Sequence, residues 1–327
     1  MIQEHPYPHL LADVGGTNIR FALVLNAEGA IVEERSFVCN DYSGLYEAIR
    51  SYLAMINVRP GSACIGIAAP VSDNLVSMTC LNWQFSQIEL KEKLGLESLI
   101  VVNDFTALAL SVPGLTDSEL NKVGGKVRKD DLPIAIIGAG TGLGVSGLIP
   151  MHRTGAIPHW IPLQGEGGHV SFTPFNERED AILRVLRNRF GHVSAERALS
   201  GPGLFNIFDA ISTIDSLPRV SIEPAEIIQK GLQNACSICR ETLDTFCAIL
   251  GTTAANLTIT LGARGGLYIG GGIVPRFGEY FSASPFRSRF EHKGRISNYL
   301  ADVPVFVIHA QNPALRGAAA VLKNQID

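Results

Sequence analysis

The sequence of 327 residues lacks the signals that direct a chain into or across a membrane. Its first residues include Glu4, Pro6 and Pro8 and show no basic stretch followed by an apolar run, so we expect no secretory signal. The two long uncharged runs, Pro133–Met151 and Phe246–Ala263, are interrupted by Gly, Thr or Asn. A membrane-spanning helix needs about 20 mostly apolar residues. We therefore expect a cytoplasmic protein without a membrane partner.

Charge of either sign is scarce. Charged residues make up 18% of the chain, and 27 Lys and Arg face 31 Asp and Glu, for a net charge of −4. This balance argues against a nucleic-acid partner, which would require a basic surface. The 46% of hydrophobic residues argue against disorder, and the length predicts roughly two domains of about 150 residues each.

Cysteine is also scarce, with six residues, and free thiols are the default in the cytosol. Cys236 and Cys239 form a Cys-x-x-Cys pair, a pattern found in zinc sites and redox centres. No second pair follows at zinc-finger spacing. The two cysteines share one helical stripe with Leu243, Phe246 and Cys247, which predicts core packing and no structural metal.

Glycine, by contrast, is abundant, with 33 residues, and marks a first candidate phosphate site. The apolar runs Leu10–Val14 and Ile19–Leu25 flank Gly15-Gly16-Thr17-Asn18, which predicts a β-hairpin. Glycine amides can approach an anion closely, and the Thr17 hydroxyl can donate to a phosphate. Asp13, at the end of the first run, has the chemistry to hold a hydrated metal ion. An ordinary hairpin turn remains the alternative.

A second segment repeats this pattern about 125 residues later, from Gly15 to Gly140. Ile134–Ile137 and Leu143–Ile149 flank the run from Gly138 to Gly142. No helix start follows, so a dinucleotide fingerprint is rejected, and no Walker A loop occurs. A second hairpin that binds phosphate is expected, with a purely structural hairpin as the alternative. The repetition predicts two related α/β halves with a boundary near Thr116.

Further elements follow from periodicity and capping residues. We expect helices at 45–56, from Ser86 to Gly95, at 105–111 and after Asn312-Pro313, and mainly helices across 178–260. Buried strands are expected at Ala63–Ala69, Leu99–Val102 and Val303–Ile308.

Asn103 and Asp104 come directly after the strand Leu99–Val102. A carboxylate at the carboxyl end of a buried strand lies where α/β folds bind ligands, and one Asp can act as a general base. The alternative is a cap on the helix that begins at Phe105, and both roles can hold together.

Three later segments are weaker candidates. Gly165-Glu166-Gly167-Gly168-His169 is too rich in glycine for a helical metal pair, so hydrogen bonding to a polyol is preferred. The run from His192 to Arg197, followed by Ser200-Gly201-Pro202-Gly203, predicts a helix end and a turn. The strand from Gly265 onward ends in Gly270-Gly271-Gly272, where the backbone can lie against a nucleotide or simply pack closely.

Together, and in this order, the segments resemble the bacterial glucokinase family, within the superfamily of sugar kinases and actin-like ATPases. The resemblance spans essentially the whole chain. It implies two related α/β domains of the actin-like ATPase type with a deep interdomain cleft. The small domain would hold residues 1–111 plus 310–327, and the large domain 112–309.

The resemblance also implies the reaction, in which ATP phosphorylates glucose at its 6-hydroxyl. Asp104 would be the base, and the sugar ligands would be Asn103, Asp104, Glu166, His169 and Glu196. ATP would be bound by Asp13, Gly15, Gly16, Thr17, Asn18, Gly138, Gly140, Thr141, Gly142, Gly271 and Gly272. Mg²⁺ would arrive with ATP without direct protein ligands, with Asp13 as its nearest candidate contact. A homodimer is implied. Family members often carry Asn in place of Cys80, so no sugar contact is assigned to the loop from Cys80 to Trp83.

Other functions remain open at this point. A kinase for mannose or fructose would carry the same motifs. Sugar-sensing regulators on this scaffold carry an N-terminal helix-turn-helix, for which the first strand near Leu10 leaves no room. An actin-like or chaperone ATPase would not need the Glu166/His169 segment or Asp104.

Overall fold

The computed structural model describes residues 6–27, 29–71, 73–78, 81–151, 159–218 and 220–323. Two compact units emerge from the contacts within the chain. The first comprises Met1–Leu115, Met151–Gln164 and Ala310–Asp327. The second comprises Thr116–Pro150 and Gly165–His309.

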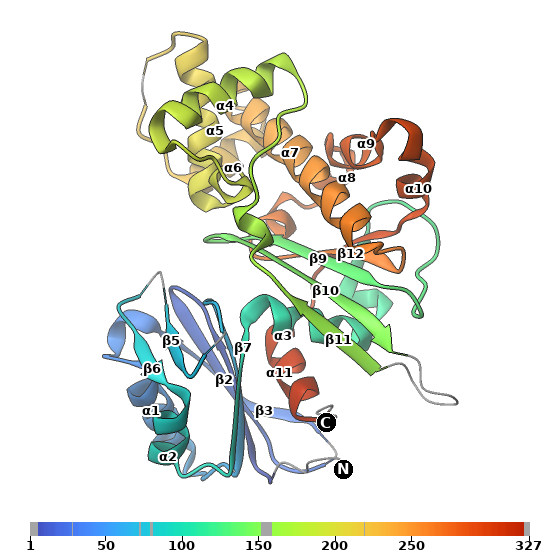
Figure 1. Ribbon diagram of the computed structural model, residues 1–327. Coiled ribbons are helices and arrows are strands. Elements are labelled where there is room, and N and C mark those ends of the chain that lie inside the picture. Colours follow the sequence, from blue (N-terminus) through green and yellow to red (C-terminus); the bar gives the residue numbers. More distant parts are fainter. Residues whose placement is uncertain are drawn as a thin grey trace. The chain divides into compact units, whose positions relative to one another are not determined.

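The first unit is built on a five-stranded sheet with the order β3-β2-β1-β4-β7 (Figure 1). β1 and β2 form the predicted antiparallel hairpin, whereas β1, β4 and β7 run parallel. Parallel strands align their carboxyl ends at one edge of the sheet, where ligands bind in α/β folds. The strands are β1 (His9–Val14), β2 (Asn18–Val24), β3 (Ile31–Val38), β4 (Ser62–Ile67) and β7 (Ser98–Asn103); a separate pair is β5 (Leu75–Ser77) with β6 (Gln84–Ser86).

Helices cover both faces of this sheet (Figure 1). On α1 (Leu45–Ile56), Leu45, Ala48, Ile49 and Tyr52 are buried at helical spacing, so one stripe faces the sheet. α2 (Gln87–Leu94) packs in the same core and begins and ends at the predicted Ser86 cap and Gly95. The opposite face is covered by α3 (Asp104–Ser111) and α11 (Pro313–Lys323).

The other sheet has six strands in the order β11-β10-β9-β12-β13-β8, and all of them except the edge strand β11 lie mainly in the segments of the second unit. Its first five strands repeat the order of the five-stranded sheet, with an antiparallel β9–β10 hairpin and parallel β9, β12 and β13. The predicted internal repeat is therefore confirmed in topology. The strands are β8 (Leu120–Lys122), β9 (Ile134–Ala139), β10 (Leu143–Met151), β11 (His159–Gln164), β12 (Gly266–Gly270) and β13 (Val305–Ile308). The short strands β8 and β11 are absent from the sequence-based prediction.

The helices of the second unit lie mainly between β11 and β12 along the chain. They are α4 (Glu177–Phe190), α5 (Gly201–Ile214), α6 (Pro224–Leu232) and α7 (Ser237–Leu261), followed by the short α8 (Glu279–Ala283), α9 (Phe286–Glu291) and α10 (Ser297–Asp302). Side chains of α7 and of the sheet share one buried core, which fixes the loops at the strand ends. Within the ranges described, no helix is long and apolar enough to cross a membrane.

Candidate functional site

The first glycine loop joins β1 to β2 in the first unit. The Gly15 N–H donates to the Asn18 carbonyl at 3.0 Å, and the Cys39 N–H donates to the Thr17 carbonyl at 2.9 Å. These bonds fix the backbone of the loop, while the side chains of Thr17 and Asn18 are exposed. The loop can therefore present its hydroxyl and amide groups to a ligand without reorganising.

Asp13 precedes this loop by two residues and lies across the hairpin from Arg20. Arg20 Nη1 donates to Asp13 Oδ2 at 3.1 Å. Burial raises the pKa of the Asp13 carboxyl, and the charge and hydrogen bond of Arg20 oppose that rise. Nucleotide-bound Mg²⁺ takes one or two carboxylates besides water and phosphate oxygens. A single carboxylate fits an ion that is carried by a nucleotide.

No group of three or more His, Cys, Asp and Glu side chains is placed to hold a metal ion in the part of the chain that the structure describes. Asp13 supplies one carboxylate, which suits contact with a nucleotide-bound Mg²⁺.

Asn103 and Asp104 lie at the carboxyl end of β7. Asn103 Oδ1 accepts the Phe105 N–H at 2.9 Å and the Thr106 N–H at 3.4 Å, so Asn103 is the cap of α3. The alternative of Asp104 as the cap is wrong, because Asp104 is already the first helical residue. Asp104 Oδ1 also accepts the Phe105 N–H, at 2.9 Å.

This strand end and the first glycine loop occupy the same edge of the sheet. The register pairs Val14 with Ile67 and Ile67 with Asn103, so β4 lies between them. Two strand spacings of about 4.8 Å put them roughly 10 Å apart. Asp104 and the candidate phosphate loop are therefore neighbours within the first unit.

The second glycine loop joins β9 to β10 in the second unit. The Gly140 N–H donates to the Gly142 carbonyl at 2.8 Å, which closes the turn. The Gly201 N–H, at the start of α5, donates to the Gly140 carbonyl at 2.8 Å. The loop is thereby attached to the amino end of a 14-residue helix, where backbone N–H groups favour an anion.

The glycine run that follows β12 packs against the beginning of the same loop. A Cβ on Gly138 would lie 2.6 Å from the Gly270 carbonyl carbon, and Gly271 has a positive φ of 77°. Only glycine at both positions permits this close approach of two backbones. The two glycine segments predicted separately as nucleotide contacts are therefore adjacent.

Glu166 precedes the turn Gly167–His169, and His169 is its last residue. The His169 N–H donates to the Glu166 carbonyl at 3.0 Å, and His169 Nε2 lies 4.0 Å from Glu166 Oε2. Both side chains are exposed. A short antiparallel pairing follows, in which the Ala195 N–H donates to the Val170 carbonyl at 2.8 Å. This pairing brings the turn next to Ala195–Arg197, which carries Glu196.

Glu196 contacts the second glycine loop directly. Glu196 Oε2 accepts the N–H of Leu143, the first residue of β10, at 2.9 Å. Gly142 makes room for the carboxylate, since a Cβ there would overlap Glu196 Oε2. One candidate sugar ligand is thus held by the backbone of a candidate phosphate loop.

The predicted site residues accordingly form two groups. The first unit holds Asp13, Gly15, Gly16, Thr17, Asn18, Asn103 and Asp104, and the second holds Gly138, Gly140, Thr141, Gly142, Glu166, His169, Glu196, Gly271 and Gly272. Cys80 lies outside the described residues.

The amino end of α5 is a feature that sequence reasoning missed. Ser200 through Gly203 had suggested a turn, whereas the structure shows the first turn of a helix. Ser200 Oγ accepts the Gly203 N–H at 3.0 Å, and Pro202 occupies the first turn. Ser as N-cap followed by Pro is the signal that should have indicated a helix start.

Known proteins resemble this chain over nearly its whole length. The glucokinase family profile matches residues 10–325. The chain belongs to the glucokinase family. It is 50% identical over 321 residues to a glucokinase of Chromobacterium violaceum, covering 98% of this chain and 90% of the relative. It is 47% identical over 321 residues to a glucokinase of Neisseria meningitidis, covering 98% and 96%.

A solved structure is similar over nearly the same extent. The crystal structure of a glucokinase from an Antarctic psychrotroph superposes with a TM-score of 0.84 at 35% identity, covering 97% of this chain and 99% of that one. The fold is that of the actin-like ATPases, to which the repeated strand order of the two sheets corresponds. As a member of this family the protein is a sugar kinase that uses ATP.

Proposed function

We propose that this protein transfers the terminal phosphoryl group of ATP to the 6-hydroxyl of glucose. The observation that carries the proposal is the bond from the Leu143 N–H to Glu196 Oε2. This bond supports the proposal because it joins Glu196, which would bind the sugar, to the backbone at the end of the loop that would bind phosphate. A polyol acceptor and a phosphoryl donor would meet at such a place.

The proposed roles follow from the chemistry of the groups. Glu196, Glu166 and His169 would bind sugar hydroxyls, because carboxylates and imidazole accept or donate directed hydrogen bonds. The side-chain oxygen of Asn103 caps α3, so Asn103 would bind a hydroxyl through its amide nitrogen. That nitrogen donates only a long hydrogen bond, of 3.4 Å, to the Ala69 carbonyl. Asp104 would accept the proton of the 6-hydroxyl as that oxygen attacks phosphorus.

The glycine loops would hold the phosphates of ATP through backbone N–H groups, which need no rearrangement when charge develops. Mg²⁺, when bound with ATP, neutralises charge on the phosphate oxygens. Asp13 would contact its water shell. Closure of two domains, at the predicted limits 1–111 plus 310–327 and 112–309, would exclude water as a competing nucleophile.

Replacing Asp104 by Asn tests the assignment of the base. Asn keeps the shape and one acceptor oxygen but cannot take a proton at neutral pH. We expect Asp104→Asn to bind glucose and ATP normally while kcat falls roughly 10²–10⁴-fold. Because Asn103 already caps α3, the stability of the helix should not change.

Glucose binding by calorimetry, steady-state kinetics and thermal unfolding on the same preparation separate the possibilities. Asp117→Asn, at an exposed 3₁₀ turn, is the matched control and should keep wild-type kcat. If Asp104→Asn retains more than about a tenth of wild-type kcat, above the range expected for loss of a base, Asp104 is not the base.

A panel of hexoses in the same coupled assay tests the sugar. Glucose should have the highest kcat/KM, and a preference for mannose or fructose would move the proposal to that substrate. A cytoplasmic location and a homodimer are further parts of the proposal. Light scattering of the purified protein would contradict the dimer if it gave the mass of one chain.

A further inference from the structure

Cys236 and Cys239 lie at the beginning of α7, away from the residues assigned to the candidate site. Cys236 is the N-cap of this 25-residue helix, and its sulfur accepts the Cys239 N–H at 3.5 Å. This bond holds the Cys236 sulfur over the first turn of α7, beside the residue that carries the second thiol. Disulfides need a Cα separation of about 4.4–6.8 Å, so one helical turn provides nearly the required geometry.

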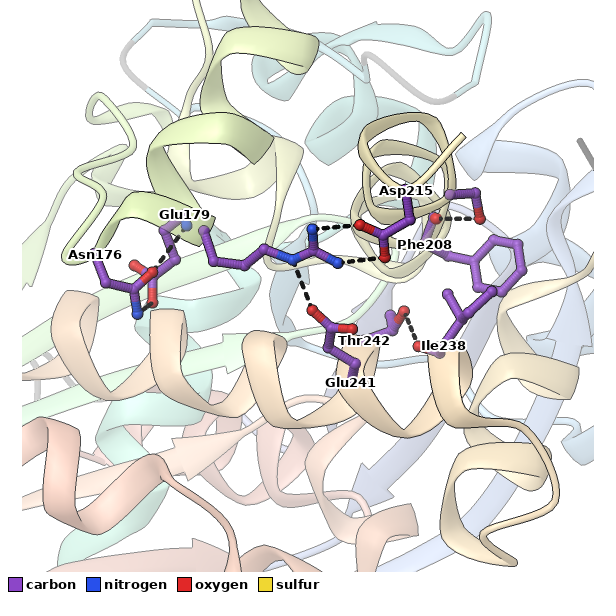
Figure 2. Close-up of polar contacts among 9 residues, drawn as sticks. Asn176, Glu179, Phe208, Asp215, Ile238, Glu241 and Thr242 are labelled. Atoms are coloured by element: carbon purple, nitrogen blue, oxygen red, sulfur yellow. Dashed lines mark hydrogen bonds and ion pairs between the residues drawn. The ribbon is translucent and has the colours of Figure 1, made fainter. Parts of the chain in front are cut away.

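The two thiols differ sharply in exposure. Cys239 is fully buried among Phe208, Ile222 and Ile227, as core packing predicts. Cys236 is only half-buried and packs against the edge of the same cluster, so the predicted core packing holds fully for Cys239 and in part for Cys236. The cap position explains this, because a residue before the first helical turn does not follow the helical stripe. Figure 2 labels Phe208, which belongs to this cluster, and Ile238, which packs against it.

The charges around the pair favour a thiolate on the outer cysteine. Burial alone would raise the pKa of Cys236, but hydrogen bonds from the N–H and thiol of Cys239 and from the Ile238 N–H, with the charge of Lys230, bring it below its ordinary value. Burial raises the pKa of Cys239 to about 12, and the hydrogen bond and negative charge of Cys236 add to that rise.

We propose that Cys236 and Cys239 are a reversible dithiol–disulfide modification site, with Cys236 as the attacking thiol and Cys239 as the resolving thiol. The oxidant is a low-molecular-weight disulfide. The Cys236 thiolate attacks one of its sulfurs, forms a mixed disulfide and releases one thiolate. Cys239 then gives up its proton, attacks the Cys236 sulfur and releases the second thiolate. Two protein thiols are oxidised, and one disulfide is reduced to two thiols.

The order of events follows from the surroundings of each sulfur. The thiolate is the reactive form, and the oxidant can reach only the exposed sulfur. Once Cys236 is in a mixed disulfide, its negative charge and its thiolate hydrogen bond are lost. Two of the causes that raise the pKa of Cys239 thereby disappear, and the inner thiol becomes able to resolve the intermediate.

Other thiols in the described ranges are poorly suited to compete. Cys39, Cys64 and Cys247 are buried, and burial raises the pKa of each. The packing of Cys239 and the cap that Cys236 provides on α7 stabilise the reduced pair. Formation of the disulfide moves the inner sulfur toward Cys236 and disturbs both. We therefore expect dithiothreitol to reverse the modification readily.

The test uses the full-length protein with glutathione disulfide near neutral pH, an acid quench, alkylation, and intact and peptide mass spectrometry. The wild type is expected to lose two alkylatable thiols, with the disulfide mapped to the peptide that contains Cys236 and Cys239. Cys239→Ala should stop at one glutathione adduct on Cys236, and Cys236→Ser should not react at α7.

Three results would overturn the proposal. They are a wild type that keeps a stable glutathione adduct, a reaction at Cys239 in Cys236→Ser, or stoichiometric zinc in the purified protein that disappears in either variant. Since the wild-type thiol count is sufficient by itself, poor folding of a variant leaves the test intact. The readout is covalent mass and does not depend on kinase activity.

Discussion

At the scale of single residues, the pair Gly142 and Glu196 links the candidate sugar site to the candidate phosphate loop. The Glu196 carboxylate binds the Leu143 N–H only because Gly142 has no side chain. The obstacle to a Cβ at Gly142 is the end of a flexible side chain, not backbone. Substitution there should displace the carboxylate and leave the fold intact.

We expect Gly142→Ala to raise the KM for glucose by about tenfold or more, since hydrogen bonds of charged groups contribute about 1.5–3 kcal/mol. Gly140→Ala is a control in the same loop for glucose binding alone, because Gly140 is a proposed ATP contact and a Cβ there meets no atom within 4 Å. It should leave the KM for glucose unchanged. Equal effects of the two variants on glucose would show that Glu196 is not positioned in this way.

The residue types predict the glycine loops and the Ser86 cap, because each of these features depends on the conformational and hydrogen-bonding properties of a few adjacent residues. The assignment of the α3 cap failed for a physical reason. Asn103 and Asp104 are equally good caps, and which one caps depends on where the backbone becomes helical. The hydrogen bond between the Leu143 N–H and the Glu196 carboxylate joins residues 53 apart in the sequence. Neither segment contains a local pattern that predicts this contact.

At the scale of elements, ion pairs tie α4 to its neighbours in two different environments. Arg178 on α4 donates to both carboxylate oxygens of Asp215 at 2.7 Å and to Glu241 on α7 at 2.8 Å (Figure 2). These side chains are between 32% and 41% exposed. Glu179, one residue further, is 3% exposed and accepts from Arg289 on α9 at 2.7 Å.

Burial decides which of these pairs stabilises the second unit more. Arg289→Met should reduce the free energy of unfolding by about 3–5 kcal/mol, because it leaves the buried Glu179 carboxylate without its cation. Arg178→Met should cost only about 1 kcal/mol, because water screens the exposed pair. Urea unfolding of both variants measures the difference. A larger loss for Arg178→Met would contradict this ranking.

Strands were harder to predict than helices. β11 has Pro162 in its centre. Proline has no N–H to donate to a neighbouring strand, so the sequence pattern does not indicate a strand there, although proline is tolerated in an edge strand. β8 has three residues in a polar segment, so it has no apolar pattern of its own. It is a strand because it pairs with β13. The longer helices are easier to predict because their apolar residues recur at helical spacing. In the second unit these apolar residues are buried in the core.

At the scale of the whole molecule, the first unit joins segments that are far apart along the chain. α11 packs on α3 so closely that a Cβ on Gly317 would overlap the Ala107 carbonyl oxygen. Together they bury one face of the first sheet. The sequence predicted both helices, but only the resemblance placed the last helix with the first domain.

Gly317→Ala should therefore destabilise the first unit by about 1–3 kcal/mol or more, since the obstacle is backbone that cannot move aside. Hydrogen exchange should show lost protection in β1, β4 and α3. Gly114→Ala, where a Cβ meets no atom within 4 Å, should leave exchange unchanged. Unaltered protection in Gly317→Ala would mean that the two helices separate without cost.

The distance along the chain between α3 and α11 has a consequence during synthesis. A ribosome adding about 5–20 residues per second needs roughly 10–40 s to make the roughly 200 residues between Leu115 and Pro313. During that interval the face of β1 and β4 that α11 covers has no partner, although the rest of its sheet has been made. The nascent chain therefore carries an exposed apolar surface during that time, and such a surface favours binding by chaperones that recognise apolar segments.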